Sequence, residues 1–406
     1  MLNQGQEKLV NEIYNWYFHS SELVFEYSGG PGTGKTFTLL EAIKRLGLSI
    51  DEILPMAYIG AAAINLKTKG LYNASTIHSG LFNPVQGVRK DTEGNLIMNT
   101  YLNRPVMGLE FEPKKLHGIK LIIIDEGYCV PFYLKQYIEM HGIKVLVCGD
   151  VDQLPPVEGE PAYLTDPSKI FYLTEIMRQA RQSGIIYLKE RIRQDLPIYP
   201  GYYGDAVVIY EDEMNDMMIA NSDIVICGRN DTRETINKRV REQILGCNSD
   251  LPTFGERVVC RKNNRMIQSD GINLANGLVG TVNNFPDLSG FDGKMFTIDF
   301  QPNLLTTTFK GIHCNFKYFT GNNELRKKIK NDKFEQGECF EFAYAVTSHI
   351  SQGAQYHTGI YLEEYLNPAI NKKLNYVGAT RFSNGLIYVI RRPKLYYNGY
   401  DFKRVN

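Results

Sequence analysis

The stretch SGGPGTGKTFTLL, residues 28–40, decides the fold. Its segment Gly29–Thr36 matches G-x-x-x-x-G-K-[ST], the pattern of a phosphate-binding loop that lies between a strand and a helix. Here the apolar, β-prone run LVFEY precedes the loop, and the helically periodic run TFTLLEAIKRL follows it. Backbone N–H groups of such a loop cradle phosphate oxygens, and the helix N-terminus adds a partial positive charge. The sequence therefore predicts a nucleotide-binding protein.

Two side chains of the loop are candidate ligands for ATP and its magnesium ion. Lys35 is expected to reach the β- and γ-phosphates, and the Thr36 hydroxyl is expected to bind Mg²⁺. Kinases, switches, motors and helicases all contain this loop, so residues further along the chain must define the reaction. The other nucleotide contacts are expected at the remaining loop positions and the first helical turn: Gly30, Pro31, Gly32, Thr33, Gly34 and Phe37.

Composition is typical of a soluble globular protein. The 406 residues include 45 basic and 45 acidic ones, so the net charge is zero and any nucleic-acid-binding surface must be a local groove. No apolar run approaches the ~20 residues that a transmembrane helix requires, which argues against a membrane protein. Seven scattered cysteines without a C-x-x-C pair argue against zinc and disulfides and favour a reducing cytoplasm.

Apolar strands alternate with helical segments, which predicts an α/β protein with parallel sheets. One set comprises LVFEY, ILPMAYI, KLIIIDE and KVLVCGD, and a second begins at DIVICGRN and ends with GLIYVI. Two segments interrupt the pattern: residues 85–116 resemble a hairpin with its turn at DTEGN, and residues 251–340 are expected to form a β-rich insert, a small barrel. The first domain is then expected at residues 1–84 and 117–195, and the second at 196–250 and 341–406.

Three polar side chains follow two of the apolar strands. LIIIDE ends in Asp125, which is expected to hold Mg²⁺, and Glu126, which is expected to act as general base on an attacking water. The adjacent acid pair favours a hydrolase over a kinase. VCGDVDQLPPV contains Gln153, whose amide is expected to bind the γ-phosphate or its water.

The order of these motifs resembles the superfamily 1 helicases, specifically the 5′→3′ branch with RecD-like and phage Dda-like enzymes. The resemblance extends over almost the whole chain and implies two RecA-like P-loop domains, with an SH3-like barrel inserted in the second. The further motifs that carry it are STIHS (residues 75–79), LTEIMRQ (173–179), NGLVGTV (276–282), FAYAVTSHISQGAQ (342–355) and LNYVGATR (374–381).

The resemblance assigns further nucleotide contacts. It implies that Gln6 reads the adenine edge, that Arg178 binds the γ-phosphate, and that Arg381 is an arginine finger from the second domain. Gln6 is alternatively a helix-start residue, and Arg178 alternatively pairs with Glu175 or another carboxylate. The same resemblance places Gln352 and Gly353 near the γ-phosphate.

The resemblance also implies single-stranded and duplex or forked DNA as partners. His78 and His349 are alternatively structural histidines, and Ile350 replaces a lysine of many relatives, which removes one phosphate contact. The hairpin is a candidate strand-separating pin, or a plain surface hairpin. The implied DNA contacts are Gly60, Ala61, Thr76, His78, Asn83, Thr347 and His349.

Together these motifs predict an ATP-dependent helicase with a monomeric core that moves 5′→3′ on single-stranded DNA. A phage-type role in replication, recombination or repair, and the host cytoplasm, are the expected context. Two alternatives stay open: an RNA helicase or translocase of the same architecture, and an ATPase switch that binds nucleic acid without unwinding it.

Overall fold

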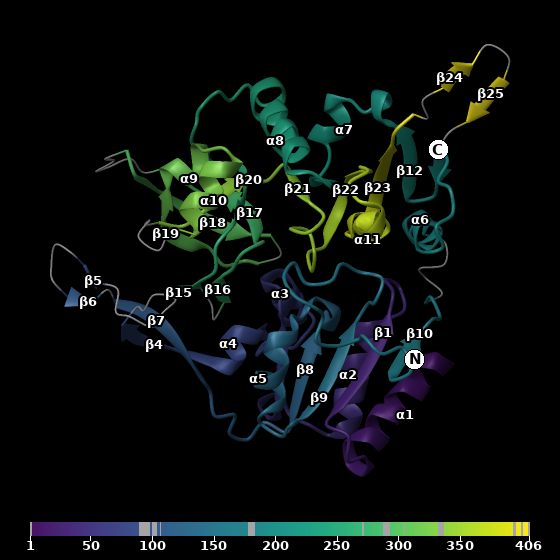
Figure 1. The fold of residues 1–406 in the computed structure, drawn as a ribbon, viewed down its shortest axis with the longest axis vertical. Coiled ribbons are helices and arrows are strands. Elements are labelled where there is room, and N and C mark those ends of the chain that lie inside the picture. The colour runs from purple at the N-terminus through teal and green to yellow at the C-terminus, as the bar shows by residue number, and fades with distance from the viewer. Residues whose placement is uncertain are drawn as a thin grey trace.

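The computed structural model describes residues 2–88, 98–99, 104–105, 107–177, 183–269, 272–286, 293–303, 305–331, 337–392, 395–398 and 401–404. Two six-stranded sheets lie one above the other, and a smaller β-rich unit lies beside the upper sheet (Figure 1). In the described part of the chain, no helix combines the length and the apolar character needed to cross a membrane.

The first sheet has the strand order β10-β1-β9-β8-β2-β3, and all of its strands are parallel. Helices bury both faces, and residues 121–124 of β8 are accordingly fully buried. One core lies under α1 and α2, and another under α4 and α5. The strands are β1 (Val24–Gly29), β2 (Ile53–Ala57), β3 (Ser75–Thr76), β8 (Leu121–Asp125), β9 (Lys144–Gly149) and β10 (Ile170–Leu173). The helices are α1 (Gln4–His19), α2 (Lys35–Leu46), α3 (Gly60–Thr68), α4 (Ile77–Leu81) and α5 (Lys135–Glu139), with 3₁₀ turns at Ile50–Glu52, Gly127–Cys129 and Phe132–Leu134.

The second sheet has the order β11-β12-β23-β22-β13-β21, with only the edge strand β11 antiparallel to its neighbour. Its strands are β11 (Gly201–Tyr203), β12 (Ala206–Tyr210), β13 (Ile224–Cys227), β21 (Ala345–Thr347), β22 (Tyr356–Leu362) and β23 (Phe382–Ile390). Its helices are α6 (Gly184–Arg193), α7 (Asp216–Ala220), α8 (Asn230–Arg239) and α11 (Pro368–Ala379), with a 3₁₀ turn at Glu211–Glu213 and a π-helical turn at Val240–Ile244. A short hairpin, β24 (Leu395–Asn398) and β25 (Asp401–Arg404), follows the sheet.

Helix α6 packs on the second sheet, although the expected domain division at residue 195 places it in the first domain. Ile185, Leu188 and Ile192 lie in the same core as strands β12, β22 and β23. Gly184 permits this close packing, since a Cβ atom there would overlap the Tyr203 carbonyl oxygen. The packing therefore places the division before Gly184.

The predicted interruptions of the α/β pattern are present. Strands β4 (Phe82–Val88) and β7 (Met107–Pro113) form an antiparallel ribbon, with the two-residue strands β5 (Met98–Asn99) and β6 (Arg104–Pro105) beyond it. The predicted turn DTEGN lies outside the described residues.

The second interruption is a five-stranded antiparallel sheet with the order β19-β18-β17-β14-β20. A parallel bridge between Cys314 and Glu338 brings the end of β19 to the segment before β20, so the two edges of the sheet approach each other. An SH3-like closure of this barrel remains a prediction. The strands are β14 (Arg257–Cys260), β17 (Val279–Val282), β18 (Met295–Pro302), β19 (Phe309–Asn315) and β20 (Phe340–Phe342); the insert also contains the hairpin β15 (Asn264–Ser269) and β16 (Ile272–Leu274) and the helices α9 (Phe316–Thr320) and α10 (Asn323–Asn331).

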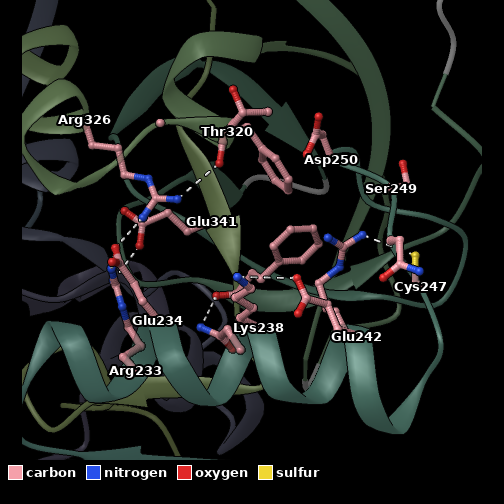
Figure 2. Close-up of a pocket in the computed structure, with 16 residues that line it drawn as sticks. Arg233, Glu234, Lys238, Glu242, Cys247, Ser249, Asp250, Thr320, Arg326 and Glu341 are labelled. Atoms are coloured by element: carbon pink, nitrogen blue, oxygen red, sulfur yellow. Dashed lines mark hydrogen bonds and ion pairs between the residues drawn. The ribbon is translucent and has the colours of Figure 1, made fainter.

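Buried ion pairs join the insert to the second domain around a cavity of about 300 Å³ (Figure 2). The Glu341 carboxylate of β20 accepts hydrogen bonds from Arg233 of α8 and from the Tyr318 hydroxyl, and Arg261 lies 3.2 Å away. Burial raises the pKa of Glu341, but Arg261, Arg233 and Arg326 outweigh burial and hold that pKa below its usual value. The charged carboxylate therefore stabilises the folded state.

We expect Glu341→Gln to lower the free energy of unfolding by about 3–5 kcal/mol, because it leaves buried arginines without their carboxylate. The loss should appear in denaturant titrations at neutral pH. It should shrink as pH falls through the lowered pKa of Glu341, since the wild-type carboxyl is then protonated as well. Glu242→Gln is the control, because its contact with Lys238 is 3.8 Å long and exposed. Equal stability of the two variants would contradict this account.

Candidate nucleotide site

The phosphate-binding loop has the backbone that its glycines require. Gly32 and Gly34 have φ angles of 84° and 81°, in the left-handed region that favours glycine, and α2 begins directly after them. The Lys35 ammonium group donates to the Gly29 carbonyl oxygen at 2.6 Å. The predicted strand, loop and helix are thus present in the expected order, and Lys35 lies folded back over the loop.

Gln6 lies against the phosphate-binding loop and is almost completely buried. Its Nε2 donates to the Thr33 carbonyl oxygen at 2.9 Å, and its Oε1 accepts from the Asn3 backbone N–H at 3.0 Å. Asn3 caps α1 in return, so Gln6 is a helix-start residue that also contacts the loop. Its reading of an adenine edge remains a prediction.

The acid pair ends strand β8 beside the loop. The Asp125 Oδ1 accepts from the Glu126 backbone N–H at 3.0 Å and from the Cys148 thiol at 3.2 Å. Glu126 has a φ of 53°, a strained conformation for a residue with a side chain. Burial and then Asp125 raise the pKa of Glu126, against the opposing charges of Lys35 and Arg381. A carboxylate with a raised pKa is suited to accepting a proton.

Gln153 follows strand β9 (Lys144–Gly149) and faces the acid pair. Its Nε2 donates to Glu126 Oε1 at 3.4 Å, and the side chain is 2% exposed. Its Oε1 is buried and has no hydrogen-bond partner among the described atoms. A buried acceptor without a partner is costly, so this oxygen fits a donor such as a water next to Glu126.

Arg381 approaches from the second domain, directly after α11. The side chain is buried, and its guanidinium group donates to the Val377 carbonyl oxygen at 3.1 Å and to Thr380 Oγ1 at 3.1 Å. It lies near enough to Glu126 for its charge to lower the pKa of that carboxyl. Arg381 is therefore held by its own domain while its charge acts across the cleft.

Several side chains of the second domain already contact the first. The Tyr376 hydroxyl donates to Asp150 Oδ2 at 2.7 Å, and the Lys373 ammonium group donates to the Tyr128 hydroxyl at 2.9 Å. Gln352 is buried and donates to the Leu154 carbonyl oxygen at 3.0 Å and to the Cys129 sulfur. The facing apolar residues are Leu154, Leu374 and Val377, with Leu366 and Ile370 beside them.

The residues of this cleft fit a magnesium nucleotide. The part of the chain that the structure describes holds no cluster of three or more His, Cys, Asp or Glu side chains suited to a metal. Mg²⁺ at a nucleotide does not need one, because phosphates and water supply most of its ligands. Thr36 and Asp125 are the predicted protein contacts, and the Thr36 hydroxyl accepts from Lys69 at 3.4 Å.

The remaining predicted nucleotide contacts are partly placed. Phe37 is 39% exposed at the start of α2, and Gly353 packs against Ala62 of α3. Arg178 lies outside the described residues, so its pairing with phosphate or Glu175 stays a prediction.

The predicted DNA contacts lie on both domains. Thr76 caps α4, and the half-buried His78 ring lies between Tyr58 and Phe82, with centroid distances of 6.2 and 6.0 Å. Gly60 begins α3, where a Cβ atom would lie 2.6 Å from Ala275 of the insert. In the first domain, Ala61 is partly buried beside Gly60, and Asn83 is exposed on β4. In the second domain, Thr347 is buried at the end of β21 and His349 is exposed after it. Ile350 belongs to the second-domain core.

The sequence motifs gave no role to three side chains at the nucleotide site: Asp150, Tyr376 and Lys189. Asp150 stands in the quoted GD segment but received no role, although Tyr376 binds it from the other domain. Lys189 of α6 donates to the Pro31 carbonyl oxygen at 3.0 Å. No local sequence signal separates Lys189 from an ordinary helical lysine, because its contact depends on how the two domains pack.

Fold and site together define a P-loop nucleotide-binding protein whose site lies between two RecA-like domains. The chain belongs to the AAA domain family, which it matches over residues 1–212. A structure of two coordinating Pif1 helicases at forked double-stranded DNA superposes with a TM-score of 0.54 and 21% identity, covering 96% of this chain and 92% of that one. This likeness confirms the predicted α/β architecture.

Two curated relatives align with less of the chain. Protein R530 of Acanthamoeba polyphaga mimivirus is 30% identical over 196 residues, which are 44% of this chain and 39% of R530. The ATP-dependent RecD2 DNA helicase of Deinococcus radiodurans is 32% identical over 168 residues, which are 39% of this chain and 20% of RecD2. The chain thus spans less than half of either relative. With the family match, these similarities confirm the resemblance to superfamily 1B helicases.

We expect Glu126→Gln to raise the free energy of unfolding at neutral pH. The folded state raises the pKa of Glu126, so the charged carboxylate costs stability above the unfolded pKa, and glutamine removes that cost without changing the backbone strain. The advantage should vanish at low pH, where the wild-type carboxyl is protonated in both states. Thermal unfolding at two pH values measures it, with the exposed Glu158→Gln as control. A destabilised variant at neutral pH would refute the expectation.

Proposed function

We propose that the protein is an ATP-dependent DNA helicase that moves along single-stranded DNA and separates duplex. One observation carries the proposal: Lys35, the Asp125–Glu126 pair and Gln153 lie in one domain, while Arg381 faces the same acid pair from the other. A site divided in this way is complete only when both domains contribute. It suits an enzyme that converts nucleotide hydrolysis into domain movement.

Each residue has a role in this proposal. Lys35 binds the terminal phosphates. Thr36 and Asp125 would hold Mg²⁺, which would supply positive charge to neutralise those phosphates. Glu126 takes a proton from the attacking water, which Gln153 orients. Arg381 leaves its partners Val377 and Thr380 and stabilises the charge of the transition state.

The proposed DNA path crosses both domains and the insert. Asn273 of the β15–β16 hairpin donates to the Ser79 hydroxyl at 3.0 Å, so the insert touches the STIHS segment of the first domain. His78 lies among aromatic rings there, and the exposed His349 follows β21 in the second domain. Aromatic side chains stack with bases whatever their sequence, which suits a translocating protein.

The relatives support DNA as the partner. RecD2 of Deinococcus radiodurans is an ATP-dependent DNA helicase, and the structure of two Pif1 helicases concerns unwinding at forked DNA. We extend the proposal to 5′→3′ movement, a monomeric core, a phage-type role and the ribbon β4–β7 as strand-separating pin, all from the resemblance to superfamily 1B. The seven cysteines are free thiols, which supports a reducing compartment such as the cytoplasm.

Nucleic-acid-stimulated ATP hydrolysis tests the proposal. We expect slow hydrolysis by the protein alone and stimulation of about tenfold or more by single-stranded DNA, because DNA bound across both domains favours the closed cleft. Lys35→Ala is the control, since a contaminating ATPase would survive that change. Equal stimulation by single-stranded RNA would replace DNA by RNA as the track, and stimulation by neither would refute the motor function.

Arg381→Ala should lower kcat by about 10²–10³-fold while ATP affinity changes little. The guanidinium group binds its own domain in the ground state, so it is expected to act on phosphate mainly in the transition state. Steady-state kinetics with saturating DNA, beside equilibrium ATP binding, separate the two effects. A loss confined to ATP affinity would instead make Arg381 a ground-state ligand.

A further inference from the structure

Lys189 is a buried lysine that the second domain directs at the phosphate-binding loop. Its helix, α6, packs in the second-domain core through Ile185 and Leu188, and the Lys189 side chain is only 1% exposed. Its Nζ donates to the Pro31 carbonyl oxygen at 3.0 Å. A Cβ atom on Gly30 would lie 2.7 Å from the same nitrogen, so the ammonium group lies directly on the loop.

The ammonium group of Lys189 is only partly compensated. Glu190 Oε1 lies 3.2 Å away, but Glu190 also accepts two hydrogen bonds from Arg193. An ammonium group has three N–H donors, and the contacts with Pro31 and Glu190 account for two of them. Among the described residues, the third donor has no acceptor, and a buried cation with a shared counterion favours the arrival of an anion.

Lys189 and Lys35 flank the start of the loop. Lys35 donates to the Gly29 carbonyl oxygen at 2.6 Å and Lys189 to that of Pro31 at 3.0 Å, so the two cations hold the carbonyls on either side of Gly30. Burial lowers the pKa of Lys189 and the charge of Lys35 adds to this, while Glu190 and Asp150 oppose it. Neutral carbonyls are weaker partners for ammonium groups than phosphate oxygens are.

The position of Lys189 favours the terminal phosphates of a bound nucleotide over its base and sugar. Lys35 is expected at the β- and γ-phosphates, and Lys189 contacts the same loop from the opposite domain. Tyr376 of α11 supports this arrangement, since its hydroxyl binds Asp150 and its ring lies 6.0 Å from the Lys189 ammonium group. Lys189 and Lys35 thus lie on the same part of the loop, from opposite domains.

We propose that Lys189 binds the γ-phosphate of ATP and thereby lets helix α6 distinguish ATP from ADP. The inference rests on the proposed use of ATP by this site. When ATP enters, the ammonium group exchanges the Pro31 carbonyl for a phosphate oxygen, which ties α6 and its domain to the nucleotide. After hydrolysis and loss of phosphate, the contact returns to Pro31, and the tie to the nucleotide is released.

Equilibrium binding of a non-hydrolysable ATP analogue and of ADP, both with Mg²⁺ and without nucleic acid, tests the proposal. We expect Lys189→Met to weaken the ATP analogue on the order of 10- to 100-fold, the value of one charge-assisted hydrogen bond, and to leave ADP unchanged. Normal ADP affinity also shows that the variant is folded. Lys189→Arg, which keeps the charge, should restore part of the affinity for the ATP analogue.

Lys373→Met is the matched control. Lys373 also crosses the cleft, to the Tyr128 hydroxyl at 2.9 Å and the Val151 carbonyl oxygen at 3.4 Å, but it does not contact the phosphate-binding loop. It should affect both nucleotides equally. If Lys189→Met changes the affinities for both nucleotides equally, or changes neither, Lys189 only joins the two domains and the inference is overturned. If the wild type binds neither nucleotide, the proposed function falls as well.

Discussion

The nucleotide site depends on acidic side chains of the first domain that lie opposite basic side chains of the second. Asp125, Glu126 and Asp150 lie in the first domain, and the second domain directs Arg381, Lys189 and the Tyr376 hydroxyl at the same region. Lys35 adds a basic side chain from the first domain. Charges in a partly buried cleft interact strongly, so the balance depends on how closely the domains approach. A triphosphate with Mg²⁺ would bring new charge into this region and so alter that balance.

A short segment, residues 347–353, connects the nucleotide site with the predicted DNA contacts. Thr347 ends strand β21, and Gln352, five positions further along the chain, contacts Cys129 and Leu154 of the first domain. Gly353 then packs on α3, whose first residue, Gly60, packs on the insert. Packed side chains and backbone contacts thus form a continuous connection between the nucleotide site and the predicted DNA surface.

Sequence motifs identify the first-domain candidates because these residues lie in short, local patterns. Lys35 follows from the loop itself, and Glu126 follows from an apolar strand that ends in acids. Arg381 required the family resemblance, since no local property of GATR shows that it faces another domain. Lys189 and the Tyr376–Asp150 contact escaped both routes. Their roles arise from packing between segments far apart in the chain, which periodicity cannot reveal.

The placement of α6 shows how the same limitation affects domain boundaries. Its apolar periodicity predicts a helix but not the sheet on which it packs, and the division at residue 195 therefore assigned it to the first domain. The structure places Ile185 and Ile192 in the second-domain core and the Lys189 ammonium group on the phosphate-binding loop. Helix α6 thus packs in one domain and contacts the phosphate-binding loop of the other. A ligand that binds at that loop would lie next to a helix of the second domain.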